Sequence, residues 1–233
     1  MRAVVLGGTS GIGLAVAGAA VKEGFDVTVA SSRQSSVDRA MALLPGVTGA
    51  VVDLTDPGRV TEFFAGHGEV DHLVYTAGEP LSLMPVGTLD PAVARDFFGL
   101  RYFGALAAIR AAVPHLRPAG SITLTSGSAG SRGGPGWAVA ASICGAIESL
   151  TRSLAVELAP LRVNAVAPGV VRSPLWHGMS DEAREEMYAQ VAAGLPAGRV
   201  GEVDDVAQAY LYCMTQSWTT GTVLAVDGGA VIA

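Results

Sequence analysis

The glycine loop near the N-terminus constrains the fold of this chain more than any other segment. Residues 3–6 read AVVL and predict a short buried strand, and residues 7–13 (GGTSGIG) follow directly, before a helical pattern begins at Leu14. Glycines allow a tight turn and a close approach to a pyrophosphate, and the N-terminus of the next helix supplies N–H donors and partial positive charge. This strand–loop–helix context predicts a dinucleotide-binding unit.

The alternation of short β-rich runs and helical segments continues to the end of the chain. The runs are AVVL (3–6), DVTVA (26–30), TGAVV (48–52), DHLVY (71–75), SITLT (121–125), RVNAV (162–166) and TVLAV (222–226). Such alternation implies right-handed βαβ crossovers and a parallel, doubly wound sheet. No linker or repeat interrupts it, so we expect one Rossmann-type α/β domain over residues 1–233.

Composition narrows the class of protein. Half of the residues are hydrophobic, and the formal net charge is −6 with a pI near 5.1, which argues against nucleic acid or an anionic membrane as a partner. No apolar run reaches the ~20 residues that span a bilayer, and the N-terminus does not resemble a signal peptide. Two cysteines give no disulfide framework, so we expect a cytoplasmic protein without a metal site.

Residues 168–199 depart from the alternating pattern. They hold PGVVRSPLW and then a polar helical stretch, DEAREEMYAQVAAG. Ligands bind outside the carboxyl ends of strands in such sheets, so an insertion at this point predicts a substrate lid. The alternative is a surface helical hairpin without a functional role.

The end of the second predicted strand bears on the choice of cofactor. An NAD site usually places a carboxylate there against the ribose hydroxyls. This chain has Ser31, Ser32 and Arg33 instead, with no carboxylate until Asp38. Hydroxyls and a guanidinium suit a 2′-phosphate, which favours NADP(H) over NAD(H). The alternative is that Arg33 is a solvated surface residue.

Together these segments resemble the short-chain dehydrogenase/reductase family in its compact single-domain form. The glycine loop resembles the family's TGxxxGIG motif, and YTAG (75–78) stands at its NNAG position. NAVAPGVVRSP (164–174), GRVGEVDDVAQA (198–209) and TTGTVLAVDGG (219–229) resemble its later signatures. The resemblance covers essentially the whole chain. It implies a seven-stranded sheet with helices on both faces, a nicotinamide cofactor, a small-molecule substrate and a homo-oligomer, either a dimer or a tetramer.

The residues expected to contact the cofactor come from the loop, from the end of the second strand and from positions that match the family. They are Gly7, Thr9, Ser10, Gly11, Ile12, Gly13, Ser31, Ser32, Arg33, Asp53, Leu54, Ala77, Gly78, Pro168, Gly169, Val171 and Ser173.

The family's catalytic asparagine, serine, tyrosine and lysine are the residues that this chain lacks. SLAVEL (153–158) resembles the end of the family's catalytic helix and fixes the register. Counting back from it puts Ala140 at the tyrosine position and Cys144 at the lysine position. The serine position falls on Gly127, and RYFG puts Arg101 at the asparagine position. A one-residue gap would move the serine position to Ser126 or Ser128.

No other register restores the tyrosine–lysine pair. The residues four places after the five tyrosines are Glu79, Leu106, Ala192, Met214 and Gln216. The one lysine of the chain, Lys22, belongs to the first predicted helix, on the adenine side of the fold. Proton donation through residues 140 and 144 is therefore not available.

A few residues are candidate substitutes, each with a plainer alternative. Ser126 and Ser128 either contact a substrate oxygen or act as turn hydroxyls, and Tyr75 either touches the ligand or packs. Arg101 either holds an anionic group or pairs with Asp96 or another acid. Cys144 is either a nucleophile or a small apolar helix residue.

Pocket-lining roles are also open for Trp137, Trp176 and His177, against packing for the tryptophans and solvation for the histidine. Two functions follow from these patterns. The first is an atypical NADP(H)-dependent oxidoreductase acting on a small carbonyl or enone compound. The second is a catalytically silent nucleotide-binding protein or partner subunit of the same fold. Non-redox chemistry on a bound ligand is a third, weaker alternative.

Overall fold

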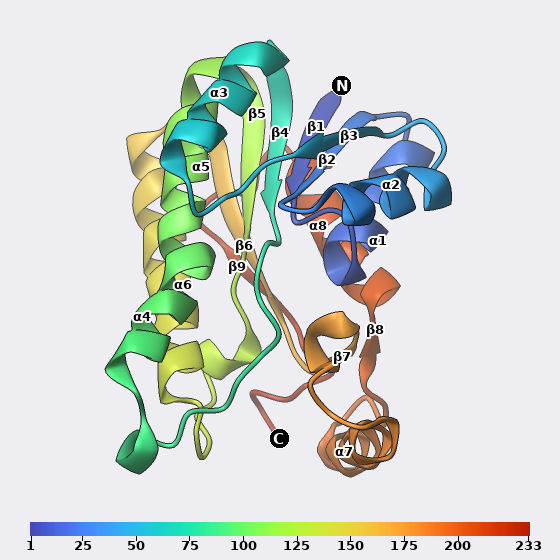
Figure 1. Ribbon diagram of the computed structural model, residues 1–233, viewed down its shortest axis with the longest axis vertical. Coiled ribbons are helices and arrows are strands. Elements are labelled where there is room, and N and C mark those ends of the chain that lie inside the picture. The colour runs from blue at the N-terminus through green and yellow to red at the C-terminus, as the bar shows by residue number, and fades with distance from the viewer.

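The computed structural model describes residues 1–233, and its centre is one seven-stranded sheet in which every pairing is parallel (Figure 1). The strand order is β3-β2-β1-β4-β5-β6-β9, the reversed order of a doubly wound fold. The strands are β1 (Arg2–Leu6), β2 (Asp26–Ser31), β3 (Thr48–Val51), β4 (Val70–Tyr75), β5 (Leu116–Thr125), β6 (Arg162–Pro168) and β9 (Val223–Val226). Each predicted β-rich run forms one of these strands, so the predicted fold class is confirmed.

Helices cover both faces of the sheet (Figure 1). One face carries α3 (Pro57–His67), α4 (Pro91–Phe98), α5 (Ala105–Ala112) and α6 (Ala138–Glu157), and the other carries α1 (Gly11–Lys22), α2 (Gln34–Leu43) and α8 (Val203–Thr215). Strand alternation explains the two cores: Val4 and Leu6 of β1 pack on the first face, whereas Ala3 and Val5 pack on the second.

Helix starts in this fold follow local chemistry. Both α3 and α4 begin with an Asp-Pro pair, in which the proline is preset for the first helical position. The Asp56 carboxylate accepts hydrogen bonds from the Gly58 and Arg59 amides at 2.8 and 3.2 Å, and Asp90 accepts from the Ala92 amide at 2.8 Å. These caps satisfy amides that have no partner within the helix.

Helix α6 is apolar along most of its length. Its mean hydropathy of 1.3 over 18 residues meets the length and composition of a membrane span, which the sequence analysis did not expect. Here, however, Val139, Ile143, Ile147 and Leu154 are buried in the core on one face of the sheet. This packing buries 28% of the apolar window, and the rest of α6 is not buried within the chain.

Residues 168–199 form a separate small layer beyond the carboxyl ends of the strands (Figure 1). A short strand β7 (Val171–Arg172) pairs with β8 (Gly201–Glu202). Between them lie the 3₁₀ turn η5 (Pro174–Trp176) and helix α7 (Asp181–Gly194). Helix α7 starts where the Ser180 hydroxyl accepts a hydrogen bond from the Ala183 amide at 3.2 Å.

Candidate functional site

A cavity of about 540 Å³ lies at the carboxyl ends of the strands. Every residue predicted to contact the cofactor lines it, from Gly7 after β1 to Ser173 after β7. Every candidate catalytic position lines it as well. The structure thus brings two groups of predicted residues, far apart in the chain, to the walls of one cavity.

The glycine loop forms the floor of the nucleotide half. Gly7 and Gly11 have φ angles of +83° and +52°, and residues other than glycine rarely adopt such positive values. A Cβ on Gly13 would lie 2.3 Å from the Gly7 carbonyl oxygen and 2.4 Å from Thr76 Oγ1. This packing draws the start of α1 against the end of β1, and no larger residue fits at Gly13.

The N-terminus of α1 is left without a protein partner. The first helical hydrogen bond runs from the Leu14 amide to the Ser10 carbonyl at 3.1 Å, so the preceding amides have no acceptor within the helix. In contrast to Asp56 and Asp90, Ser10 makes no side-chain cap, and the first turn holds no acidic residue. An uncapped helix start with its positive dipole end fits the pyrophosphate of a dinucleotide.

Basic and hydroxyl side chains surround the end of β2. Ser31, Ser32 and Arg33 line the cavity there, as do Ser36 and Arg39 of α2. Neither arginine has a carboxylate within 4.0 Å, so both guanidinium groups are available to an anion. Ser36 and Arg39 were not predicted from the sequence. Arg39 stands six residues after Arg33 and three after Ser36, so the first turns of α2 carry both Ser36 and Arg39 on one face.

A fixed carboxylate lies beyond the end of β3. Asp53 Oδ1 accepts hydrogen bonds from Thr55 Oγ1 at 2.7 Å and from the Thr55 amide at 2.9 Å. These bonds, the hydroxyl contact first, lower the pKa of Asp53 below its usual range. Asp53 and Leu54 line the cavity where the family resemblance implies the adenine.

The catalytic half contains no tyrosine–lysine pair. Ala140 and Cys144 lie one turn apart on α6, and both line the cavity. A Cβ on Gly127 would lie 3.3 Å from Cys144 Sγ, so the three altered positions are neighbours. Burial raises the pKa of the Cys144 thiol, which keeps it neutral and disfavours the nucleophile hypothesis.

The serine hydroxyl groups near these positions differ in their hydrogen bonding. Ser126 Oγ donates a hydrogen bond to Glu148 Oε1 at 3.0 Å, and Glu148 lies one turn beyond Cys144 on α6. Ser128, at the start of the turn η4 (Ser128–Gly130), lines the cavity and makes no side-chain hydrogen bond within the protein. Ser126 thus directs its proton toward α6, whereas the hydroxyl of Ser128 has no partner in the protein.

Tyr75 is held in a structural hydrogen bond. At the end of β4, its hydroxyl donates to the Leu100 carbonyl at 2.6 Å. A Cβ on Gly104 would lie 2.6 Å from that hydroxyl, so the contact depends on a glycine there. Burial raises the pKa of Tyr75, which favours the neutral phenol. The packing interpretation of Tyr75 fits this arrangement better than proton transfer.

Arg101 stands on an irregular turn between α4 and α5. Residues Gly99–Gly104 form one π-helical turn, η2, which directs the side chain toward the loop after β4. Its Nε lies 3.2 Å from Glu79 Oε2, and its Nη2 donates to the Glu79 carbonyl. The ion pair expected with Asp96 or another acid is formed with another acid: Asp96 is exposed on α4, and the partner is Glu79, the residue that follows YTAG. Sequence reasoning did not predict the π turn that selects this partner.

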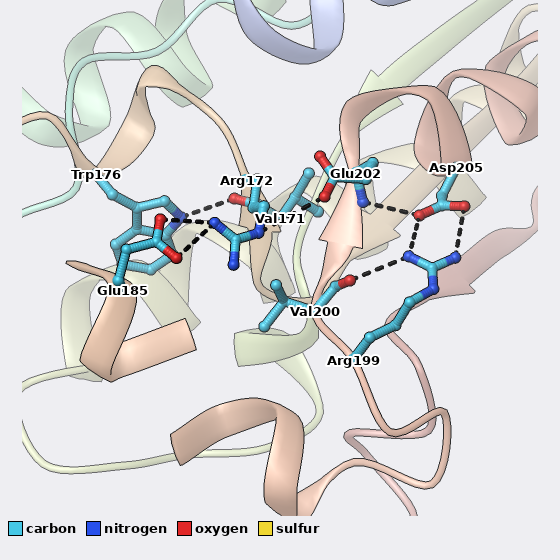
Figure 2. A network of polar contacts seen from close by, with 8 residues as sticks. All are labelled: Val171, Arg172, Trp176, Glu185, Arg199, Val200, Glu202 and Asp205. Atoms are coloured by element: carbon cyan, nitrogen blue, oxygen red, sulfur yellow. Dashed lines mark hydrogen bonds and ion pairs between the residues drawn. The ribbon is translucent and has the colours of Figure 1, made fainter. Parts of the chain in front are cut away.

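Arg172 connects the elements of the layer formed by residues 168–199 through ion pairs (Figure 2). Its Nη1 lies 2.7 and 2.9 Å from the two Glu185 carboxylate oxygens on α7, and its Nε lies 3.6 Å from Glu202 on β8. The guanidinium also stacks 4.4 Å from the centre of the Tyr188 ring. One side chain therefore joins α7 to the small sheet.

A second arginine fixes the far end of the same layer. Arg199 binds both oxygens of Asp205 at 2.6 and 2.8 Å (Figure 2), and these contacts help lower the pKa of Asp205 to about 2. Next to the cavity, Trp176 Nε1 donates to the Val171 carbonyl at 2.9 Å. Trp137, Trp176 and His177 line the cavity, so of the alternatives left open for them the pocket-lining one fits the structure.

Fold and site together define a dinucleotide-binding Rossmann domain, and the family follows from comparison with known proteins. The family model described as an SDR-like Rossmann domain matches residues 1–233. The short-chain dehydrogenase/reductase ATR9 from Stachybotrys chlorohalonatus is 36% identical over 245 residues, which cover 98% of this chain and 96% of that relative. The chain therefore belongs to the short-chain dehydrogenase/reductase (SDR) family.

Two solved structures are similar over their whole length. One is described as a small-chain dehydrogenase in complex with NADPH: it is 37% identical, has a TM-score of 0.89, and the match covers 100% of this chain and 99% of that one. The other is described as the MalC reductase/Diels-Alderase from Malbranchea aurantiaca: it is 30% identical, has a TM-score of 0.92, and the match covers 99% and 96%. These relatives support an oxidoreductase of the SDR type.

Proposed function

We propose that this protein is an NADP(H)-dependent oxidoreductase that reduces a small carbonyl or enone compound without the family's tyrosine–lysine pair. The observation that carries the proposal is the single cavity. It joins an uncapped, acid-free helix start to a chamber whose catalytic positions hold Arg101, Gly127, Ala140 and Cys144. The nucleotide half fits a dinucleotide, and the other half leaves room for a substrate.

The preference for NADP(H) rests on the charge around the end of β2. Arg33 and Arg39 carry the only charges among the cavity residues from β2 and α2, and no carboxylate there competes for the ribose hydroxyls. One similar structure is described as an NADPH complex, in line with this preference. NAD(H) remains the alternative cofactor.

A bound nicotinamide would supply the hydride, and the residues of this chain would bind and orient the substrate. Trp137 and Trp176 give the substrate chamber apolar walls that exclude water. The segment 168–199, anchored by Arg172, is proposed as the lid of that chamber. With alanine at position 140, a proton must come from water or from another side chain.

A silent nucleotide-binding protein is the second candidate function. The observation in its favour is that all four positions of the catalytic set are altered while the glycine loop is kept. In this case the protein would bind NADP(H) as a sensor or as a partner subunit, and the substrate chamber would have no turnover.

Two measurements in sequence test these functions. Fluorescence titration with NADPH and NADH tests cofactor binding. Absence of binding at millimolar NADPH would refute both the oxidoreductase and the silent nucleotide-binding protein. A panel of ketones and enones is then followed by NADPH consumption. Turnover of any member supports the oxidoreductase, whereas background rates with saturating cofactor favour the silent binder.

We also propose that the chain forms a homo-oligomer, a dimer or a tetramer. Large apolar side chains lie on the outside of the α4–α6 layer, where Phe103 is 60% exposed and Val156 is 80% exposed. Trp218, at 94%, lies on the loop before β9. Contiguous exposed apolar patches mark interaction surfaces, and the proposal is that Phe103 and Val156 belong to such a patch. Light scattering behind a sizing column measures the mass directly, and a monomer would contradict this proposal.

A further inference from the structure

The guanidinium of Arg101 is only partly used by the protein. Nη2 donates to the Glu79 carbonyl, and Nε lies 3.2 Å from the Glu79 carboxylate. Nη1 has no hydrogen-bond acceptor in the protein. It lies beside Gly78, where a Cβ would be 2.7 Å away, so the absence of a side chain at Gly78 makes room for it. Arg101 thus brings a free donor to the cavity wall.

Arg101 is also held rigidly. Its guanidinium stacks 4.6 Å from the centre of the Phe97 ring, and its side chain is only 22% exposed. The π turn η2 fixes the backbone from which it projects. A donor with so little conformational freedom is pre-organised, so it loses little conformational entropy when it binds a substrate oxygen.

The surroundings decide which kind of oxygen suits this donor. The ring of Phe97 covers one face of the Arg101 guanidinium, and the cavity that Arg101 lines also includes the apolar residues Leu81, Trp137, Ala140 and Ile143. Glu79, 36% exposed, already balances the charge of Arg101. A balanced pair favours an oxygen on which negative charge develops during a reaction over a permanently charged carboxylate, which Glu79 would repel.

We infer that Arg101 is the oxyanion donor of this site and that the substrate is an apolar α,β-unsaturated carbonyl compound, an enone, which binds Arg101 Nη1 through its oxygen. This inference rests on the proposed NADP(H)-dependent reduction. It assigns a catalytic role to a residue that stands where the family has asparagine.

The chemistry of an enone matches the groups that are present. Bound NADPH would supply a hydride to the β-carbon and would be oxidised to NADP⁺, while the carbon–carbon π electrons shift through the conjugated system and leave negative charge on the oxygen as an enolate. The enolate oxygen would accept the hydrogen bond from Arg101, which keeps its proton. Water would then protonate the α-carbon, and the hydroxide that results would pass to bulk solvent. A simple ketone would instead give an alkoxide, which needs an acid at once, and position 140 has none to give.

The test uses p-nitrophenol as a probe, because its phenolate resembles an enolate and absorbs visible light whereas the phenol does not. The full-length protein is saturated with NADP⁺, and the pKa of the bound probe is measured from its absorbance. We expect wild-type protein to favour the bound phenolate. The Arg101→Gln substitution should lower the acid ionisation constant of the bound probe by ~10- to ~100-fold, which corresponds to the loss of one charge-assisted hydrogen bond.

Two further variants separate this role from a structural ion pair. Glu79→Gln leaves the donor and removes the competing carboxylate, so ionisation of the bound probe should increase. Arg110→Gln, exposed on α5, is the matched control and should change nothing. Unchanged probe ionisation in Arg101→Gln, or changes of the same sign in the Arg101 and Glu79 variants, would overturn the inference.

Failure of the inference remains distinguishable from failure of the proposed function. Each variant is also titrated with NADPH, whose affinity depends on the nucleotide half and should stay within about 3-fold of wild type. A wild-type protein that does not bind NADPH refutes the proposed function. A protein that binds NADPH but ionises the probe equally with and without Arg101 refutes only the role of Arg101.

Discussion

The two halves of the cavity are built on different principles. The nucleotide half relies on the backbone: a tight glycine turn and the free amides at the start of α1, with side chains added at Arg33 and Arg39. The catalytic half would rely on single side chains at fixed positions, and the ungapped comparison with the family puts Arg101, Gly127, Ala140 and Cys144 there. Binding of a cofactor through backbone amides is retained when side chains are replaced, whereas proton transfer through a side chain is lost. Cofactor binding and catalysis are therefore separable in this fold.

The largest effect is expected at the glycine loop. Gly13→Val should reduce NADPH affinity by at least ~100-fold, because its side chain cannot fit beside the Gly7 carbonyl oxygen, 2.3 Å from the Cβ position. Titration by fluorescence measures this, with circular dichroism as a check of folding. Gly66→Ala in α3 is the control, since nothing lies within 4 Å of its Cβ. An unchanged affinity in Gly13→Val would remove the basis of the comparison.

Restoring the family's catalytic set tests the other half. The quadruple variant Arg101→Asn, Gly127→Ser, Ala140→Tyr and Cys144→Lys should gain simple ketone reduction by ~10²-fold or more, the usual value of a positioned acid. The same variant should lose enone reduction, because it lacks Arg101. Steady-state rates of NADPH consumption measure both. The control carries phenylalanine at position 140, and an equal gain in that control would contradict the account.

A buried histidine in the body of the sheet gives a contrast with both halves. His72 of β4 is 3% exposed; its Nδ1 lies 2.9 Å from Ser121 Oγ, and its Nε2 has no partner. Burial lowers the pKa of His72 to about 4, from 6.5. In this window the unfolded chain binds more protons, so stability falls as the pH falls from 6.5 to 4, by about 3 kcal/mol.

Urea unfolding at pH 7 and at pH 4 measures this loss. His72→Gln cannot titrate, so about 3 kcal/mol of the pH dependence should be absent from it. At pH 7, where His72 is neutral in the wild-type protein, the His72→Gln variant should bind NADPH as wild type does. If wild type and His72→Gln lose stability equally between these two pH values, the assigned cause is wrong.

The choice between phosphorylated and unphosphorylated cofactor is a smaller effect. Arg33→Ala should weaken NADPH binding by ~10-fold and leave NADH binding nearly unchanged, because the lost guanidinium contacts only a 2′-phosphate. Parallel titrations with the two cofactors measure the ratio. Arg59→Ala on α3, which lies outside the cavity, is the control. Equal losses for both cofactors would place Arg33 elsewhere in the site.

The smallest effect is expected at the anchor of the proposed lid. Arg172→Ala removes an exposed ion pair and should raise the KM of a turned-over substrate by about 2- to 5-fold. Hydrogen exchange in α7 should rise with it. Arg184→Ala, whose partner Asp181 lies within the same helix, is the matched control. Equal behaviour of the two variants would argue against an anchoring role for Arg172.

Most of the fold and the cavity walls could be predicted because their signals are local. The seven strands follow from short β-rich runs, and the glycine loop is contiguous. Contacts between distant segments were not predictable. The pairing of Arg101 with Glu79 depends on a π turn that no simple periodicity marks, and Arg172 meets Glu185 only after α7 folds back. The hydrogen bond from Tyr75 to Leu100 arises in the same way, from packing across the sheet.

A crystal structure with bound NADP⁺ tests the central claim most directly. The account predicts the pyrophosphate on the amides at the start of α1 and the nicotinamide in the chamber lined by Ala140 and Cys144. Arg101 should be the nearest charged side chain to the reactive C4 atom, with no tyrosine or lysine within hydrogen-bond distance of a substrate there. A tyrosine hydroxyl beside C4, from this chain or from a partner subunit, would contradict the claim that the usual proton donor is absent.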